Sequence, residues 1–234
     1  MTAFDQLLLK IKRRESPAMS LAYDAYKRLM AFDVPDNEAM RILYGGIYTA
    51  NHVMVDATEW AKSKFLYAPM LRARCEQVGA GLNVTNAPYV RGHARIRIGR
   101  DCTFSSLNVR TGRFRDKPEL EFGDECYVAY GVMFQLNQRI KMGNHVLIAG
   151  NSTVQDSDGH PSDPEKRMRG ELELGADDIA PVEIKDYAWL GRSSHVLKGV
   201  TIGKGAVVAA GSVVIGDVPD GAIAMGVPAR ILKR

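Results

Sequence analysis

The chain has 234 residues, of which 46% are hydrophobic and 25% charged, a composition that suits a folded protein with one large or two small domains. The net charge of +4 is mild, and no block of Lys and Arg alternates with aromatic residues, which argues against a nucleic-acid-binding protein. The three cysteines cannot all pair and lack the spacing of a zinc site, which predicts free thiols, a reducing compartment and no bound metal.

The first 80 residues follow helical patterns and contain no repeat. A first helix is marked by an apolar face that consists of Phe4, Leu7, Leu8 and Ile11. Residues 18–32 read as a second helix, and a third begins near position 37. A short basic helix is expected over residues 70–78.

We expect residues 1–80 to form a helical cap on the solenoid described below or an oligomerisation region, because an open solenoid end exposes unpaired strand edges. The alternative is a weak contact between the basic amphipathic helices and a membrane surface. The longest uncharged run, residues 42–55, is too short to cross a bilayer. Residues 1–16 lack the apolar core of a signal peptide, so we expect a cytoplasmic protein that is at most peripheral to the inner membrane.

From residue 184 onward the sequence repeats with a period of six. The period is marked by aliphatic residues at Ile184, Leu190, Val196, Ile202, Val208 and Val214. Such a period fits neither a helix nor a single strand, and a short fixed repeat is typical of a solenoid whose units bury their apolar faces against one another. The residue four places after each aliphatic is mostly small, which suits a narrow interior.

Three units of six close one triangular coil of about 18 residues. A second signature, aliphatic-x-aliphatic-Gly, begins at Ile96, Ile140 and Val200 and, more loosely, at Leu120. Its spacing indicates coils of this length with a small insertion near residues 113–118 and a large one between residues 155 and 181. The predicted parts are a helical region (1–80), a solenoid (81–218) with a loop at 156–181, and a tail (219–234).

The repeat resembles that of the hexapeptide-repeat acyltransferases. The resemblance is carried by Trp189-Leu190-Gly191, Gly199-Val200-Thr201-Ile202-Gly203, Ala210-Gly211-Ser212-Val213-Val214, Asp217-Val218-Pro219 and Gly226-Val227-Pro228-Ala229. It implies an all-β solenoid, a left-handed parallel β-helix, after an N-terminal α-helical region, so that the whole chain is α+β. The left-handed turn comes from the resemblance alone, because the general rule for parallel crossovers favours a right-handed one. The family also implies a homotrimer.

The long loop carries the chemistry that the sequence offers. It opens with Gln155-Asp156-Ser157-Asp158-Gly159-His160-Pro161, and long excursions from a regular scaffold commonly hold functional residues. His160 is the candidate general base, because an ordinary imidazole accepts a proton near neutral pH. Asp158 and Asp156 are near enough in sequence to orient the ring, and Asp163 is a further option. The sequence does not choose among them; we assign His160 and Asp158 as catalytic.

This segment is similar to the catalytic loop of bacterial sugar O-acetyltransferases, in which a Gly-His-Pro sequence holds the catalytic histidine. The resemblance implies that His160 is the base. The other histidines fit this role less well. His145 occupies an outward repeat position, His93 lies in an irregular first coil, and His52 lies in the helical region. His195 lies on the coil surface, where it lines an acyl groove or is solvated.

The same resemblance implies acetyl-CoA as co-substrate, bound along the solenoid at the junction of two subunits. The residues expected to border its pantetheine arm are Trp189, Gly191, Arg192, Ala210 and Gly211. Arg230 and Lys233 are expected to face the nucleotide phosphates through charge-assisted contacts. The sequence departs from the family at Gly216, where a coenzyme-binding Lys is common. It departs again at Gly131, where several relatives carry an acceptor-binding Asn that Asn137 could replace.

We expect an acetyl-CoA-dependent O-acetyltransferase that modifies a hydroxyl of a polysaccharide or a lipid-linked glycan precursor. The alternative is N-acetylation of an amino sugar or nucleotide-amino sugar, since the same base would serve it. A second alternative is a non-catalytic β-helix scaffold, which would not need the long loop. A metal enzyme similar to the γ-class carbonic anhydrases needs three histidines on zinc, two of them close in sequence, and the chain has no close pair.

Overall fold

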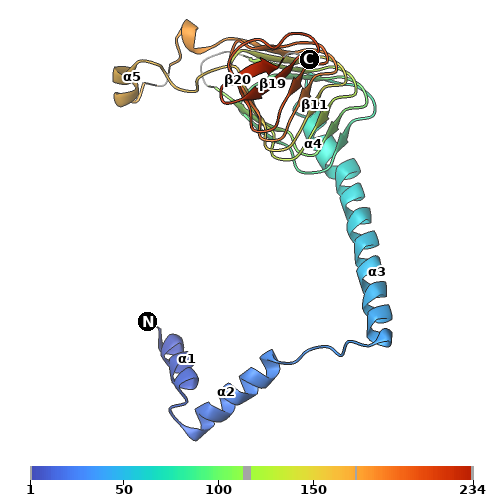
Figure 1. Ribbon diagram of the computed structural model, residues 1–234, viewed down its shortest axis with the longest axis vertical. Helices are drawn as coiled ribbons and strands as arrows, with labels where there is room; N and C mark the ends of the chain where they lie inside the picture. Colours follow the sequence, from blue (N-terminus) through green and yellow to red (C-terminus); the bar gives the residue numbers. More distant parts are fainter. Residues whose placement is uncertain (1, 113–116, 172, 233–234) are drawn as a thin grey trace. The chain divides into compact units, whose positions relative to one another are not determined.

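The computed structural model describes residues 2–112, 117–171 and 173–232. The chain divides into two compact units, Met1–Val55 and Asp56–Arg234, each of which is described by itself. Figure 1 shows helices in the first unit and stacked coils of strand in the second.

The first unit contains the two helices that the sequence predicts at its start. α1 (Ala3–Arg13) begins at Thr2, whose hydroxyl accepts the Asp5 N–H while the Asp5 carboxylate accepts the Thr2 N–H. α2 (Pro17–Met30) packs against α1. Arg14, which ends α1, forms an ion pair with Asp24 of α2 at 2.8 Å. The turn between the helices is therefore fixed by local caps and one charge pair.

The segment after the third helix differs from the sequence prediction. α3 (Glu38–Lys62) continues into a π-helical turn, η1 (Ser63–Tyr67), and into α4 (Ala68–Arg72). The predicted helix over 70–78 is wrong beyond residue 72, because residues 77 and 78 form a strand. The Glu76 N–H donates to Ile96 O at 2.9 Å, so tertiary pairing overrides the local helical pattern. No helix among the described residues is long and apolar enough to cross a membrane.

The second unit is a parallel β-solenoid with three sheets, which confirms the fold that the six-residue repeat predicts. Sheet A contains β1 (Gln77–Val78), β4 (Arg95–Ile98), β7 (Glu119–Phe122), β10 (Arg139–Met142), β13 (Val182–Ile184) and β16 (Thr201–Ile202). Sheet B contains β2 (Asn83–Val84), β5 (Thr103–Phe104), β8 (Tyr127–Val128), β11 (Leu147–Ile148), β14 (Trp189–Leu190), β17 (Val207–Val208), β19 (Ile223–Gly226) and β20 (Ala229–Leu232). Sheet C contains β3 (Tyr89–Arg91), β6 (Asn108–Thr111), β9 (Met133–Leu136), β12 (Thr153–Gln155), β15 (His195–Val196) and β18 (Val213–Val214). The final pair, β19 and β20, is antiparallel.

The solenoid interior is filled by the aliphatic residues that mark the repeat. The six aliphatics from Ile184 to Val214 are each at most 1% exposed. In sheet A, Ile184 lies between Met142 and Ile202 in register, so equivalent positions of successive coils stack directly. Each buried side chain of this size stabilises the fold by roughly 1.5–3 kcal/mol. Apolar burial therefore sets the register of the coils.

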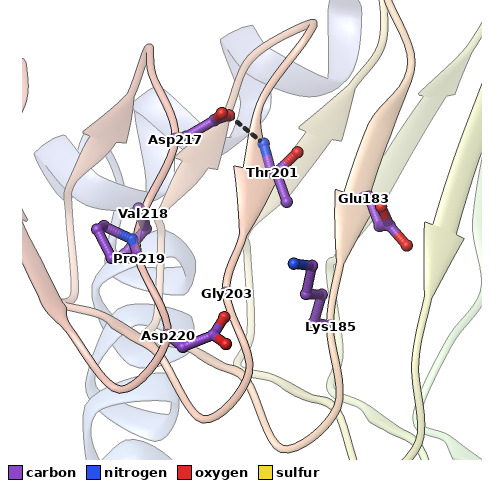
Figure 2. A pocket seen from close by; sticks show the side chains of 8 residues that line it. All are labelled: Glu183, Lys185, Thr201, Gly203, Asp217, Val218, Pro219 and Asp220. Atoms are coloured by element: carbon purple, nitrogen blue, oxygen red, sulfur yellow. Dashed lines mark hydrogen bonds between the residues drawn. The ribbon is translucent and has the colours of Figure 1, made fainter.

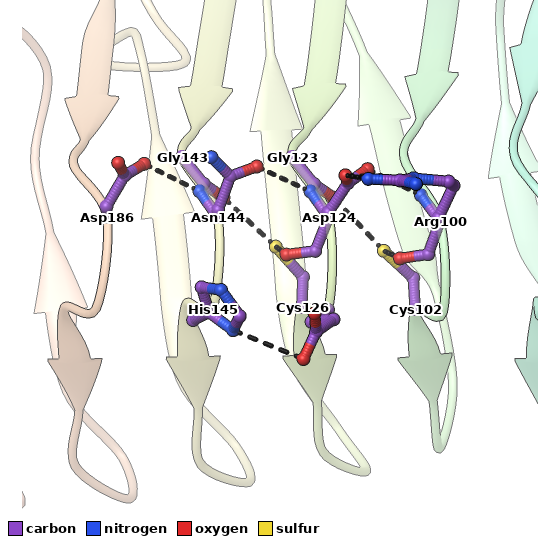
Figure 3. A network of polar contacts seen from close by, with 10 residues as sticks. Arg100, Cys102, Gly123, Asp124, Cys126, Gly143, Asn144, His145 and Asp186 are labelled. Atoms are coloured by element: carbon purple, nitrogen blue, oxygen red, sulfur yellow. Dashed lines mark hydrogen bonds and ion pairs between the residues drawn. The ribbon is translucent and has the colours of Figure 1, made fainter.

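At one corner of the solenoid, polar side chains join each coil to the next (Figure 3). Asp124 accepts the Arg100 N–H at 2.8 Å, and Asn144 accepts the Asp124 N–H at 2.8 Å. Asp186 accepts the Asn144 N–H at 2.7 Å. The Arg100 guanidinium also donates to Asp124, which lowers the pKa of that carboxyl. These bonds satisfy backbone groups at a turn that has no strand partner.

Candidate active site

The long loop leaves the solenoid at Asp156, directly after β12. Asp156 is fully buried, and its carboxylate accepts three backbone N–H groups from the corner between β9 and β10. The distances are 2.7 Å from Asn137, 2.6 Å from Gln138 and 2.8 Å from Arg139. Burial raises the pKa of Asp156, while the three donors oppose that rise. Asp156 thus fixes the start of the loop to the preceding coil.

The two ends of the loop form a short antiparallel stem. Ser157 on the outgoing strand bridges Ile179 on the returning strand. The Asp158 N–H donates to Asp178 O at 3.0 Å, and the Ala180 N–H donates to Asp156 O at 2.9 Å. The loop is therefore anchored by backbone pairing before it extends from the coils toward α5 (Pro164–Met168) (Figure 1).

Asp178 ties the returning strand to the far part of the loop. Its carboxylate accepts the Gly175 N–H at 2.8 Å and the Ser162 N–H at 3.2 Å. The bond from Gly175 is the main reason that the pKa of Asp178 lies below its ordinary value. Asp178 itself is 5% exposed, whereas Gly175 and Ser162, which donate to it, lie on the exposed part of the loop.

His160 lies at the turn beyond the stem, and its side chain is exposed. Gly159 before it has a φ of 77°, a left-handed conformation that favours glycine. The segment after His160 is held by Arg167 of α5, whose Nη1 donates to Pro161 O at 2.7 Å and to Ser162 O at 2.6 Å. The backbone on both sides of the histidine is thus fixed while the imidazole faces solvent.

The three aspartates considered as partners of His160 have other roles. Among the described residues, the imidazole forms no hydrogen bond with any of them. Asp156 holds backbone amides, Asp158 accepts a hydrogen bond from Lys198 Nζ, and Asp163 caps α5 by accepting the Glu165 N–H at 2.8 Å. The expected contact between Asp158 and His160 is not made, and the Asp158 carboxylate is instead bonded to the Lys198 ammonium.

Five of the expected coenzyme residues lie together along the edge where sheet B turns toward sheet C. Trp189 points outward from β14 and is 51% exposed. Gly191 and Arg192 follow it in the corner, and Ala210 and Gly211 occupy the corner of the next coil. The two corners are bonded, since the Gly211 N–H donates to Arg192 O at 2.9 Å.

A glycine is required at position 191 on this edge. A Cβ at Gly191 would lie 2.6 Å from Ala210 N and 2.8 Å from Val208 O, so no larger residue fits there. Arg230, on β20, lies near the same edge, because the Gly226 N–H at the end of β19 donates to Ser212 Oγ at 3.1 Å. Lys233 lies outside the described residues.

Asn137, the expected substitute for an acceptor-binding Asn, is 7% exposed. Its Nδ2 donates to Ser157 Oγ at 2.5 Å, while its backbone N–H donates to Asp156. The Asn137 side chain therefore supports the stem of the loop.

A shallow cavity of about 410 Å³ lies on sheet A at the last coils (Figure 2). Its lining consists of Glu183, Lys185, Thr201, Gly203, Asp217, Val218, Pro219 and Asp220. Asp217 accepts the Thr201 N–H at 2.7 Å, and Asp220 accepts the Lys204 N–H at 2.8 Å. These carboxylates serve the backbone at the solenoid end, and none of the expected catalytic or coenzyme residues lines the cavity. We therefore assign it to the end of the fold and not to the candidate site.

The other histidines are placed in separate environments. His145 stacks on Tyr187 with ring centroids 4.7 Å apart, and His52 contacts Tyr48 in α3. His195 lies on the outward side of β15. Within the part of the chain that the structure describes, no three His, Cys, Asp or Glu side chains gather as ligands for a metal.

The sequence alone did not reveal Lys198, Arg167 or Asp178 as parts of the site. Lys198 contacts the loop only after the chain has returned to the coil, while Arg167 and Asp178 act through bonds to backbone groups, which leave no motif in the sequence. The adjacent Asp177-Asp178 on the returning strand is the one usable clue, because a polar pair there mirrors Asp156 and Asp158 on the outgoing strand.

Known proteins share the fold of this chain. Residues 181–216 match the family model "Bacterial transferase hexapeptide (six repeats)". AntD, an N-acyltransferase from Bacillus cereus whose structure includes dTDP and 3-hydroxybutyryl-CoA, has a TM-score of 0.57 at 18% identity. The likeness covers 71% of this chain and 86% of AntD, and at this identity it concerns the fold.

Curated relatives match part of the sequence. Galactoside O-acetyltransferase of Lactococcus lactis is 36% identical over 115 residues, which are 49% of this chain and 53% of that protein. The chain spans about half the length of several such relatives. WbbJ of Escherichia coli K12, named for lipopolysaccharide biosynthesis O-acetyl transfer, is 30% identical over 149 residues, covering 62% of this chain and 75% of WbbJ. With its six-residue repeat and its three-sheet solenoid, the chain belongs to the hexapeptide-repeat transferase family.

Proposed function

We propose that this protein transfers an acetyl group from acetyl-CoA to a hydroxyl of a saccharide, with His160 as general base. The observation that carries the proposal is the loop itself: an exposed imidazole stands on a stem that is bonded to the solenoid on both strands. A binding scaffold would not need such a device. The galactoside and lipopolysaccharide O-acetyltransferases among the relatives support the choice of acceptor.

In the proposed reaction, His160 accepts the proton of the acceptor hydroxyl, and the oxygen attacks the thioester carbonyl. The tetrahedral adduct carries an oxyanion that backbone N–H groups can stabilise. It collapses by breaking the C–S bond, and the leaving thiolate takes the proton from the imidazolium. The products are the acetyl ester and free CoA. An exposed histidine suits this cycle, because an imidazole can both accept and release a proton near neutral pH.

The edge between sheets B and C suits the coenzyme. Gly191, Ala210 and Gly211 place no large side chain on this edge, so that the narrow pantetheine arm can lie close to the backbone. The exposed side chains of Arg192 and Arg230 supply positive charge for the phosphates, and Lys233, three residues after Arg230 in the sequence, is a further candidate. When bound, acetyl-CoA supplies the activated thioester, while the chain itself supplies the base and the binding edge.

The proposed assembly is a homotrimer in the cytoplasm, where acetyl-CoA is available. An outward-facing column on sheet B argues for contact with a neighbouring subunit. It consists of Tyr127, Leu147 and Trp189, which lie in register and are 42%, 39% and 51% exposed. The matching column of sheet A carries Glu121, Lys141 and Glu183. An exposed apolar column is typical of a surface that another protein covers.

The test is turnover of acetyl-CoA with a panel of hexosides and the matching amino sugars, read as CoA release and as product mass. Transfer to oxygen gives an ester that hydroxylamine cleaves, whereas transfer to nitrogen gives a stable amide and would favour the amino-sugar alternative. His160→Ala should lower the rate by roughly 10²- to 10⁴-fold. His93→Ala, also at an exposed histidine, is the matched control. Equal rates for His160→Ala and the wild type would contradict the assignment.

A further inference from the structure

Lys198 lies at the base of the long loop but belongs to the coil that follows it. It comes two residues after β15. The next residue, Gly199, donates its N–H to Ala180 O at 3.1 Å, so the backbone beside Lys198 is bonded to the returning strand of the loop. The Lys198 side chain is therefore anchored on the solenoid and reaches the loop from outside it.

The ammonium group of Lys198 contacts both strands of the stem. Its Nζ donates to Asp158 Oδ2 on the outgoing strand and to Asp177 O on the returning strand, the latter at 2.6 Å. Three N–H donors allow one ammonium group to serve both acceptors. Asp158 stands two residues before His160. A single cation thus closes the stem at the level where the histidine turn begins.

This contact differs from the ion pairs on the sheets. Arg95 and Glu119 pair at 3.2 Å across β4 and β7, two strands that backbone hydrogen bonds already join. The stem has a single β-bridge, Ser157 with Ile179, whereas β4 and β7 pair over four residues. A side chain that spans both strands therefore has more influence on the geometry of the stem than an ion pair has on the sheet. The Lys198 side chain is only 26% exposed, which limits solvent screening of the contact.

We propose that Lys198 is a positioning residue for His160. By holding Asp158 against Asp177, it sets the direction in which the 158–161 turn leaves the stem and hence where the imidazole meets the acceptor hydroxyl. Asp158 accordingly acts through Lys198 and not as a partner of the imidazole. This inference rests on the proposed function of His160. A misplacement of about 1 Å at a reacting group can cost roughly 100-fold in rate, so a clamp of this kind has a large effect on turnover.

The experiment compares Lys198→Met, Lys198→Arg, His160→Ala and Lys141→Met in the full chain. Lys141, on the outward side of β10, is the matched control. Acetyl-CoA turnover with the acceptor found in the panel gives kcat and KM, and hydrogen exchange follows the Asp158 and Ala180 amides of the stem. Lys198→Met is expected to lower kcat about 10- to 100-fold, to change the KM for acetyl-CoA less than about threefold and to speed exchange of both amides. Lys198→Arg should recover most of kcat, and Lys141→Met should match the wild type.

A wild-type kcat in Lys198→Met would overturn the inference. If the stem amides nevertheless exchange faster in that variant, the contact is merely structural. A melting temperature of Lys198→Met within about 2 °C of the wild type excludes general unfolding as the cause of a lower kcat. If unfolding does occur, a Lys198→Arg variant that folds but stays as slow as Lys198→Met overturns the inference. If His160→Ala keeps the wild-type rate, the proposed function fails and the role of Lys198 with it. If His160→Ala is inactive and Lys198→Met is fully active, only the inference about Lys198 fails.

Discussion

The coils over residues 182–218 and the loop over residues 156–181 are neighbours in sequence but are held by different forces. In the coils, the repeated aliphatic side chains are almost fully buried, and each strand donates its N–H groups to the next coil. In the loop, most side chains are exposed, and Met168 reaches 88%. The loop keeps its form through charged and polar side chains that bind backbone groups, chiefly Asp156, Asp178 and Lys198.

This difference separates the residues that set stability from those that set activity. Apolar burial is spread over many equivalent positions, so the scaffold tolerates changes on its surface. The loop depends on a few directional bonds, so a single polar substitution can move it without unfolding the protein. We therefore expect core substitutions to act on folding and stem substitutions to act on the loop.

The largest expected effect is in the coils. Ile202→Asp places an unpaired charge at a fully buried position and should cost several kcal/mol, about as much as the stability of a domain. Ile215→Asp is the control, because Ile215 is 60% exposed. The measurement is soluble yield and thermal melting. A cooperative melt near the wild-type temperature for Ile202→Asp would mean that the assigned register is wrong.

An intermediate effect is expected at the junction of coil and loop. Asp156→Ala leaves three backbone N–H groups without their acceptor and should lower the free energy of unfolding by about 2 to 3 kcal/mol. Asp163→Ala removes only the cap of the short, exposed α5 and should cost less than about 1 kcal/mol. Urea unfolding of both variants measures the difference. Equal losses would show that the two aspartates are equivalent and that the stem has no special anchor.

The smallest effect is a pH dependence confined to the loop. The pKa of Asp178 is lowered by the Gly175 N–H, so the folded loop binds this proton less tightly than the unfolded chain does. Its contribution is present above the ordinary Asp pKa of about 3.9 and is lost as the pH falls through the lowered value. Hydrogen exchange at the Gly175 and Ser162 amides, corrected for intrinsic rates, should quicken in that window. Asp178→Asn should remove this pH dependence.

The contribution of Asp156 to stability changes with pH in the opposite direction, so it must be distinguished from that of Asp178. Burial raises the pKa of Asp156, so its contribution to stability falls as the pH rises from about 3.9 toward the raised value. The Asp178→Asn variant retains Asp156, and the difference between variant and wild type therefore reports Asp178 alone. A wild-type pH profile in the variant would contradict the role given to Asp178.

The fold could be predicted from the sequence because its information is local and repeated. Six aliphatics at one period specify the inward side of each strand, and the structure buries all of them. The helix expected over 70–78 failed for the opposite reason. Gln77 and Val78 have no repeat of their own and become a strand only by pairing with Arg97 and Ile98 of the next coil. Local propensity cannot reveal a partner about twenty residues away.

The candidate site could be predicted only in part. The long insertion and its Gly-His-Pro sequence single out His160, and the small residues near Gly191 single out the edge of the coils. The contact of Asp158 could not be foreseen, because its partner Lys198 reaches the loop only after the chain has formed three more strands. A carboxylate beside a histidine in sequence therefore says little about which cation it meets in space.

The reversed strand at the end of the solenoid has a consequence for assembly. Parallel coils can in principle add to one another without limit, from one molecule to the next, as in a growing fibre. Here β20 turns back along β19, from Ala229 opposite Gly226 to Leu232 opposite Ile223, and takes the free edge of sheet B. An incoming coil finds a strand of the wrong direction there. The reversed strand therefore blocks the addition of a further parallel coil along the edge of sheet B.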